Sequence, residues 1–545
     1  MSRPRVLVLG LDGLDAGFAE RMMAAGEMPA LARLGQRSAR FRLDHGAAQR
    51  SGLAWEHVAS GLAPEAAQRW AAVEFDPVTY RAWQEGARFA PWWADLPLRP
   101  VVFDTPYVTL TRARNTRGIV AWGAHDPGTV AAARPAELAT EVLDRFGPYP
   151  AAQWTYGLPW PSARRAATMG AALSGALDLR SRVACWLARE RLPDWDLFIT
   201  VAGEAHGAVE GLWHGVDPDH PLHRHPSGEA AGRALIDVHR SLDGMVRDVA
   251  AAAGDAAIIA LSMGGMGPNH SDAASMVLLA ELLYRHAFGR SLLTLPREWT
   301  AEPRSVPILP EDGNWQDATA NWVPEPSEKE PPPPAGPLRS LARRLPRPLK
   351  SFLKGIDAAA AEWRSLDTRG TRQELYWQPV MRYRRYWRRM PAFALPSFYD
   401  GRIRLNVRGR ERDGLIDPAR YEETCRELEA MLGECRDPRT GEPAVAFVER
   451  AWTRNPLALT GSEADLVVGW RGVIAALEHP RLGLIGPVPL RRTGGHTGQH
   501  GMAYVCAPGV EAGERGVRSS FDVVPTVVRL LGKEPPARMS GCSLR

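Results

Sequence analysis

The sequence predicts an α/β protein with a mostly parallel central sheet, helices on both faces and an inserted cap region. Continuous apolar runs in "RVLVLGLDG" (5–13), "WDLFITVAGEAH" (195–206) and "DAAIIALSMGG" (255–265) are typical of strands buried on both faces. Helical patterns lie near 164–191, 228–253, 273–286 and 417–433. Because strands that alternate with helices favour a parallel sheet, these observations together predict the fold class.

The middle of the chain interrupts this alternation. "VPEPSEKEPPPPAGP" (323–337) is too rich in proline for a helix or a central strand and predicts a surface linker. Basic and apolar residues interleave in 338–356 and 381–390, and strand signals return near 401. We therefore expect three segments, with the insertion standing over the carboxyl edge of the sheet. They are a first part of the core (1–290), an insertion or cap (291–400) and a second part of the core (401–545).

The basic residues of the insertion permit three interpretations. They fit a solvated cap that packs on the core through its Leu and Phe side chains. They also fit a lid that attracts an anionic substrate, or a peripheral contact with an anionic membrane.

Composition narrows the class of protein. The net charge of +5 over 545 residues permits an anionic substrate but does not indicate nucleic-acid binding. The first apolar run is too short for a signal peptide, and no apolar stretch is long enough to span a bilayer. The five cysteines lack C-x-x-C spacing, which indicates reduced thiols. We expect a cytoplasmic protein, and the sequence leaves its oligomeric state open.

Two candidate catalytic residues lie at the ends of predicted elements: Asp12 follows a predicted strand, and Ser51 precedes a predicted helix. Asp12 ends the first apolar run, where it can be a ligand for a metal or phosphate site, or a turn residue before glycine. Ser51 stands just before a predicted helix. Its hydroxyl fits a helix cap, and it also fits a nucleophile favoured by the free amides of the helix.

The stretch 203–226 is rich in potential metal ligands. His206 and Glu210 are four residues apart, so on a helix they share one face and can bind one metal ion. His214 would continue that face. A histidine-rich surface loop without a metal is the alternative interpretation. Three further histidines of this stretch fall in a loop with prolines: His220, His223 and His225.

Several segments together carry a family pattern. They are "VLVLGLDGLD" with the helices that follow it, "SGLAWEHVASGLAP" (51–64), the stretch 403–443 with its "NVRGRERDG", "EADLVVGW" (463–470) and "FDVVPTVVRLLGKEPPARMSG" (521–541). The chain resembles the alkaline phosphatase superfamily, in its type I phosphodiesterase/nucleotide pyrophosphatase branch. The resemblance covers nearly all of the chain outside 290–390, and it implies an alkaline-phosphatase-like core.

This resemblance also implies a set of metal ligands. Family members bind two metal ions, commonly zinc. One ion is held by the first Asp, the nucleophile and an Asp-His pair in "S-D-H-G-M-G". The other is held by a D-x-x-x-H pair and a late His. Here the first Asp and the nucleophile correspond to Asp12 and Ser51, and the late His corresponds to His496 in "TGGHTGQHG".

The sequence departs from the family at two of these motifs. At the D-x-x-x-H position stand His206 and Glu210, which can both bind metal. At the Asp-His pair stand Met263 and Gly264, which cannot. We therefore expect a reduced site with one divalent ion, which the resemblance indicates to be zinc, near Asp12, His206, Glu210 and His496. Glu204 and His270 are spare donors nearby.

The resemblance implies a hydrolase of phosphoric esters in which Ser51 is the nucleophile, acting on a small phosphorylated substrate. One alternative is an inactive relative that binds a ligand or a partner protein, since the loss of two ligands is what such decay would produce. A phosphoryl or related group transferase and a sulfatase are further alternatives, because related enzymes use the same kind of site.

Overall fold

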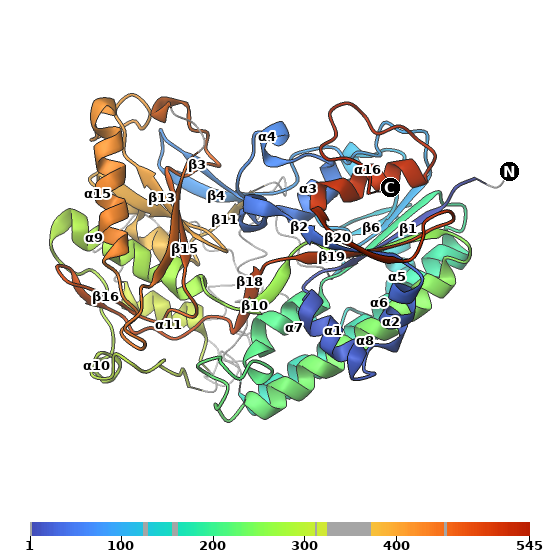
Figure 1. Cartoon of the computed structure of the whole chain (residues 1–545), viewed down its shortest axis with the longest axis horizontal. Coiled ribbons are helices and arrows are strands. Elements are labelled where there is room, and N and C mark those ends of the chain that lie inside the picture. Colours follow the sequence, from blue (N-terminus) through green and yellow to red (C-terminus); the bar gives the residue numbers. More distant parts are fainter. Residues whose placement is uncertain are drawn as a thin grey trace, which may run out of the picture.

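The computed structural model describes residues 3–123, 129–154, 162–310, 313–323, 372–451 and 455–544. Two lobes are visible in Figure 1, one built on a large sheet and the other on a smaller sheet. The basic segment 338–356, for which a membrane contact is one interpretation, lies outside the described residues, as does nearly all of the proline-rich linker.

The large sheet is mixed but mostly parallel, as the sequence predicts. Its nine strands lie in the order β20-β2-β19-β9-β1-β8-β5-β6-β7. All neighbouring pairs from β9 to β6 are parallel, whereas β19 and β7 run antiparallel to their neighbours. In sheet order the bounds are β20 (Gly513–Ser519), β2 (Ala39–Asp44), β19 (Gly501–Cys506), β9 (Ala257–Ser262), β1 (Val6–Leu11), β8 (Leu197–Ala202), β5 (Pro100–Phe103), β6 (Arg117–Val120) and β7 (Ala132–Arg134).

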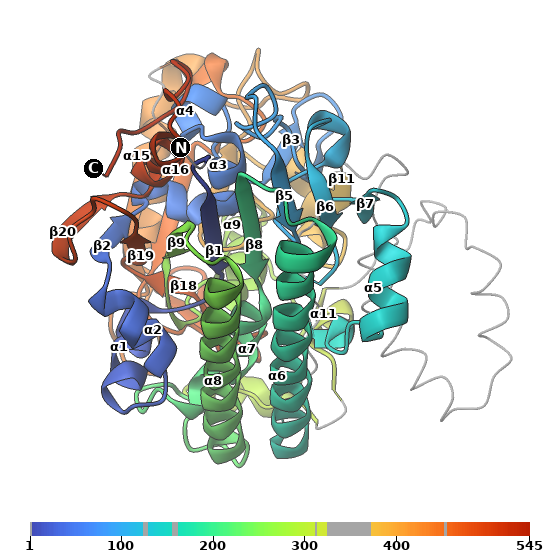
Figure 2. The same cartoon turned by 90° about the vertical axis from the view of Figure 1, so that its right-hand side faces the viewer.

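Strand β1 shows why the apolar runs are continuous. Its alternate side chains enter two different cores, because successive residues of a strand point to opposite faces. Leu7 and Leu9 pack with helices α1 (Ala16–Ala24), α2 (Pro29–Gln36), α6 (Ala163–Trp186) and α8 (Gly228–Ala252). Val6 and Val8 pack with α3 (Ala54–Ser60) and α16 (Val523–Leu530). Helices therefore cover both faces of the sheet, and Figure 2 shows α6 and α8 side by side on one of them.

The four helical patterns of the sequence are confirmed. They correspond to α6, α8, α9 (Leu279–Phe288) and α15 (Tyr421–Gly433). Two of these helices adjoin a π-helical turn, at Leu187–Arg191 after α6 and at Ala274–Leu278 before α9. The sequence patterns include these turns because both turns also bury apolar side chains, among them Leu187 and Val277.

The second lobe contains a four-stranded antiparallel sheet in the order β12-β13-β15-β14. Helices α9, α11 (Trp315–Trp322) and α15 contribute to the same core. Described residues on both sides of position 400 pack in this core, and the boundaries at 290 and 400 stay a prediction. The strands are β12 (Ala392–Leu395), β13 (Gly401–Leu405), β14 (Val445–Arg450) and β15 (Leu466–Trp470). Three smaller sheets are formed by β3 (Val73–Asp76), β4 (Arg81–Glu85) and β11 (Arg372–Glu374), by β10 (Gly265–Pro268) and β18 (Gly494–Gly498), and by β16 (Leu477–His479) and β17 (Gly483–Ile485). Smaller helices are α4 (Pro64–Ala67), α5 (Leu138–Phe146), α7 (Glu204–Leu212), α10 (Arg297–Thr300) and α14 (Arg384–Trp387).

The "NVRGRERDG" motif has a structural role in the second lobe. Arg410 binds the carboxylates of Glu411 and Asp465, with N···O distances of 2.8 Å to each. Asn406 accepts a hydrogen bond of 2.7 Å from the hydroxyl of Tyr80 and donates to two backbone carbonyls. Because these polar groups are buried and hydrogen-bonded, the motif joins β13 to β15 and to the β3–β4 hairpin.

The thiols fit the expectation of reduced cysteines. All five cysteines are free, and burial raises the pKa of Cys425 to about 11 and that of Cys435 to about 12. A thiol with so high a pKa stays protonated and unreactive at neutral pH. In the parts of the chain that the structure describes, no helix combines the length and apolarity needed to cross a membrane.

Candidate metal centre

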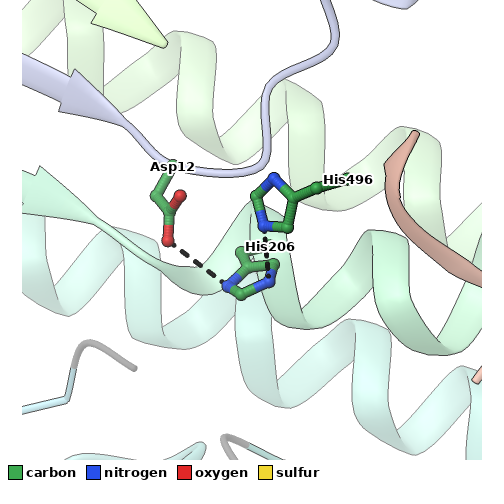
Figure 3. A group of neighbouring side chains, drawn as sticks. All are labelled: Asp12, His206 and His496. Atoms are coloured by element: carbon green, nitrogen blue, oxygen red, sulfur yellow. Dashed lines mark hydrogen bonds and ion pairs between the residues drawn. The ribbon is translucent and has the colours of Figure 1, made fainter. Parts of the chain in front are cut away.

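Three side chains from distant parts of the sequence meet at the carboxyl end of β1. Asp12 follows β1, His206 lies on α7 and His496 lies on β18 (Figure 3). One potential ligand atom from each lies within 4.8 Å of the others. His206 Nδ1 is 3.3 Å from Asp12 Oδ2, and its Nε2 is 3.2 Å from Nε2 of His496.

A glycine brings the β1 turn against helix α7. Gly13 has φ = +77°, and a Cβ atom at this position would lie 2.2 Å from Cα of His206. Both the left-handed conformation and this close approach exclude other residues. The Asp-Gly pair that ends the first apolar run is therefore what allows Asp12 to reach His206.

The environment of Asp12 favours its ionised form. Burial, the largest single influence, would raise the pKa of this carboxyl group, but the lowering effects of its neighbours, chiefly His206, together outweigh burial. His496 and Trp55 act in the same direction, and the pKa of Asp12 is held well below its usual range. The Trp55 ring passes over Gly10 of β1, where a Cβ atom would be only 2.5 Å from the ring.

Glu210 contacts His206 but lies outside the compact group of three. Its Oε1 is 3.1 Å from His206 Nε2, as expected for residues four apart on a helix. The same oxygen also contacts the guanidinium of Arg492. Arg492 binds both oxygens of Asp272 at 2.6 and 2.8 Å, and burial lowers its pKa to about 9. No sequence pattern indicated a role for Arg492, although it stands four residues before His496 in "RRTGGH".

These residues fit a divalent metal ion. Two nitrogen ligands of a tetrahedral zinc, each about 2.0–2.1 Å from it, lie about 3.4 Å apart, close to the 3.2 Å between the two Nε2 atoms. His206 directs Nδ1 at a carboxylate, which is how metal-binding histidines are usually oriented, and with the proton on Nδ1 the lone pair is on Nε2. The buried Oε1 of Glu210 lies against Nε2 of His206 and the guanidinium of Arg492. Two imidazoles and a carboxylate are a ligand set that zinc prefers.

Ser51 forms a turn in this structure. Its hydroxyl donates a hydrogen bond of 2.6 Å to the carbonyl of Ala48 and accepts one of 3.1 Å from the amide of Leu53. Ser51 is buried, and Gly52 after it has φ = +73°. Helix α3 begins only at Ala54 and has no side-chain cap, so Ser51 stabilises the turn before the helix rather than its first turn.

The spare donors lie in other networks. Arg180 binds both oxygens of Glu204 at 2.9 and 3.0 Å, and Tyr149 donates a third hydrogen bond of 3.1 Å. Glu204 therefore fixes the start of α7 instead of facing the metal group. His270 is outside the group of three. Among the remaining histidines, His214 and His225 both contact the hydroxyl of Ser227.

Comparisons with known proteins give likenesses of structure only. No family model matches the chain, and no curated protein matches its sequence. Phosphonoacetate hydrolase from Sinorhizobium meliloti 1021, solved with phosphonoformate, is 14% identical; the match covers 97% of this chain and 96% of that one, with a TM-score of 0.43. Human ectonucleotide pyrophosphatase/phosphodiesterase 5 is 10% identical, with 99% and 97% covered and a TM-score of 0.47. The murine form of that protein is also 10% identical, with 98% and 96% covered and a TM-score of 0.45.

With identities of 10–14% and TM-scores below 0.5, the likeness concerns the overall fold. The site is therefore interpreted from its own residues.

Proposed function

We propose that the protein is a hydrolase of phosphoric esters that uses one divalent ion, zinc, and Ser51 as the nucleophile. The observation that supports this most is the convergence of Asp12, His206 and His496 on one point at the carboxyl end of β1. His206 and His496 would bind the ion through Nε2 and Glu210 through Oε1, and Asp12 faces the same point.

Each residue has a distinct part in this proposal. When bound, the ion supplies a Lewis acid that stabilises negative charge on the phosphoryl group. Asp12 would accept a hydrogen bond from the Nδ1–H of His206 and so keep the Nε2 lone pair of His206 directed at the ion. Ser51 must turn its hydroxyl away from the Ala48 carbonyl before its oxygen can attack phosphorus. The bond from phosphorus to the ester oxygen would break as the new bond forms, the serine proton would leave with the alcohol, and water would then release the phosphoryl group from Ser51.

One observation favours a second candidate, a protein that binds a phosphorylated ligand without cleaving it. Both hydrogen-bonding roles of the Ser51 hydroxyl are taken by backbone groups, so the residue has a structural role without any catalysis. An inactive protein would retain the ion and the ligand but give no product. A transferase or a sulfatase using the same site would be recognised by its product.

The test combines metal analysis with an activity screen. We expect one equivalent of zinc in the purified protein and slow hydrolysis of aryl phosphate monoesters or diesters. Ser51→Ala should keep the ion and lose turnover. Ser60→Ala is a matched control, because Ser60 is also buried and its hydroxyl also accepts an amide hydrogen bond from two residues further on.

The possible outcomes separate the proposals. A protein without metal would contradict the metal-dependent hydrolase. Full activity in Ser51→Ala would exclude Ser51 as the nucleophile. An ion with no turnover of any ester, together with tight binding of a phosphate analogue, would establish the binding protein instead.

Ligand substitutions test the metal site separately. His496→Ala should reduce the zinc content to a small fraction of that of the unaltered protein, because it removes one of two imidazole ligands. His500→Ala is the control from the same part of the chain, one residue before β19, and should leave the zinc content unchanged.

A further inference from the structure

The side chain of Gln49 lies where a side chain at position 264 would point. A Cβ atom built on Gly264 would be 3.4 Å from Gln49 Nε2 and 3.5 Å from its Cγ and Cδ. Gly264 is not among the glycines with a left-handed backbone, so its conformation does not itself require glycine. The Cβ atom alone would fit at these distances, but a longer side chain would extend into the volume that Gln49 occupies.

Gln49 is held firmly in this position. Its Nε2 donates a hydrogen bond of 2.6 Å to the carbonyl of Gly498, on the strand that carries His496. Gln49 belongs to the 3-10 helix Gly46–Ser51, which ends at the proposed nucleophile. It therefore contacts three segments of the site: the turn of Ser51, the loop at Gly264 and strand β18.

The neighbouring position is filled in a different way. Met263 is buried, 5% exposed, in the core that also contains side chains of α3 and α16. Its thioether side chain is thus an apolar packing group of that core. At the two positions that correspond to the Asp-His pair, Met263 packs in the core and the side chain of Gln49 fills the space beside Gly264.

We propose that Gln49 occupies the position of the absent histidine ligand and thereby limits the site to one metal ion. The inference rests on the proposed function, because it concerns the same metal site. A neutral amide already bonded to a carbonyl is a poorer ligand for a divalent ion than a carboxylate or an imidazole. Restoring the two ligands is then insufficient, since an imidazole at 264 would collide with the Gln49 side chain.

The experiment compares the zinc content of four proteins at equal free zinc, by mass spectrometry of the native protein and by elemental analysis. They are the unaltered chain, Gln49→Ala, the double variant Met263→Asp/Gly264→His, and the triple variant that combines all three changes. We expect the triple variant to bind one ion more than the double variant, and Gln49→Ala alone to bind no more than the unaltered chain. Gln36→Ala, at an exposed glutamine of α2, replaces Gln49→Ala in a control triple variant that should gain no ion.

The result is read as a difference between variants, so it is separate from the test of the proposed function. Equal ion counts in the double and triple variants would overturn the role of Gln49, whatever the unaltered chain binds. A second ion in the double variant would overturn it as well. An unaltered chain without zinc would contradict the proposed function alone.

If the triple variant is unstable, the inference can be tested by comparing the melting temperatures of Gly264→His with and without Gln49→Ala. Gly264→His should lower the melting temperature of the metal-free protein by several degrees when Gln49 is present. In the Gln49→Ala background the same change should have a much smaller effect, because the space is open. Equal shifts in both backgrounds would show that Gln49 does not occupy the position.

Discussion

Acid should destabilise this protein through buried neutral histidines, and His239 provides the simplest test. It lies on α8, fully buried, with its ring edge-to-face against Phe18 at 4.8 Å between centroids. Nδ1 donates a hydrogen bond of 2.8 Å to the carbonyl of Leu235, and in the described structure Nε2 has no partner. Burial disfavours the charged ring and lowers the pKa of His239 from 6.5 to about 4.

The magnitude follows from proton linkage. An unfolded chain protonates this histidine near pH 6.5, whereas the folded protein does so only near pH 4. Between these values the unfolded state binds more protons, so the free energy of unfolding falls as the pH falls. At about 1.4 kcal/mol per pKa unit, the loss amounts to about 2 kcal/mol between pH 7 and pH 5 and about 3 kcal/mol once pH 4 is passed.

The assay is urea unfolding, followed by tryptophan fluorescence at pH 7 and at pH 5. His239→Leu replaces the ring with a non-titrating side chain of similar volume, so the variant should lose about 2 kcal/mol less than the unaltered protein over this range. Val238→Ala, at the neighbouring buried position, is the control; it should be less stable at both pH values without any change in the pH dependence. If His239→Leu shows the same pH dependence as the unaltered protein, the reasoning is refuted.

Three further substitutions test the geometry of the site. Gly13→Ala should lower the free energy of unfolding by several kcal/mol more than Gly26→Ala. Both glycines have φ = +77°, but only a Cβ atom at position 13 would lie against the His206 backbone. Urea unfolding of both variants measures the difference, and equal losses of stability would contradict the close approach. Asp12→Asn should weaken zinc binding about 10–100-fold in calorimetry, by removing the carboxylate that orients His206, and unchanged affinity would exclude that role. Arg180→Met should destabilise the protein by about 3–5 kcal/mol, because it leaves two buried carboxylates without their cation; a loss below 1 kcal/mol would show that the network is not ionised.

Much of the fold could be predicted because its signals are local. The apolar run of β1 and the amphipathic patterns of α6, α8 and α15 reflect which faces of these elements are buried. Buried positions recur at a fixed spacing in a helix or strand and are occupied by apolar residues, so the sequence shows them directly. The candidate metal ligands could be located for a related reason. His206 and Glu210 lie on one helix, where a spacing of four residues fixes a shared face.

Other features depended on contacts that no local pattern contains. The second lobe gathers residues from 73 to 490 into one core, which the alternation of strands and helices could not indicate. Arg492 contacts Glu210 across 282 positions of the chain, and its charge lies beside the candidate metal site only because β18 folds back beside α7.

The sequence by itself determined which residue types are available for the candidate site: Asp12, His206, Glu210 and His496. Only the tertiary structure decided that Asp12 faces Nδ1 of His206 and that Gln49 fills the space beside Gly264. Side-chain orientation and space are properties of packing between segments distant in the sequence. A single sequence shows which residues can pack in a core, but it does not show which atoms of distant segments come into contact.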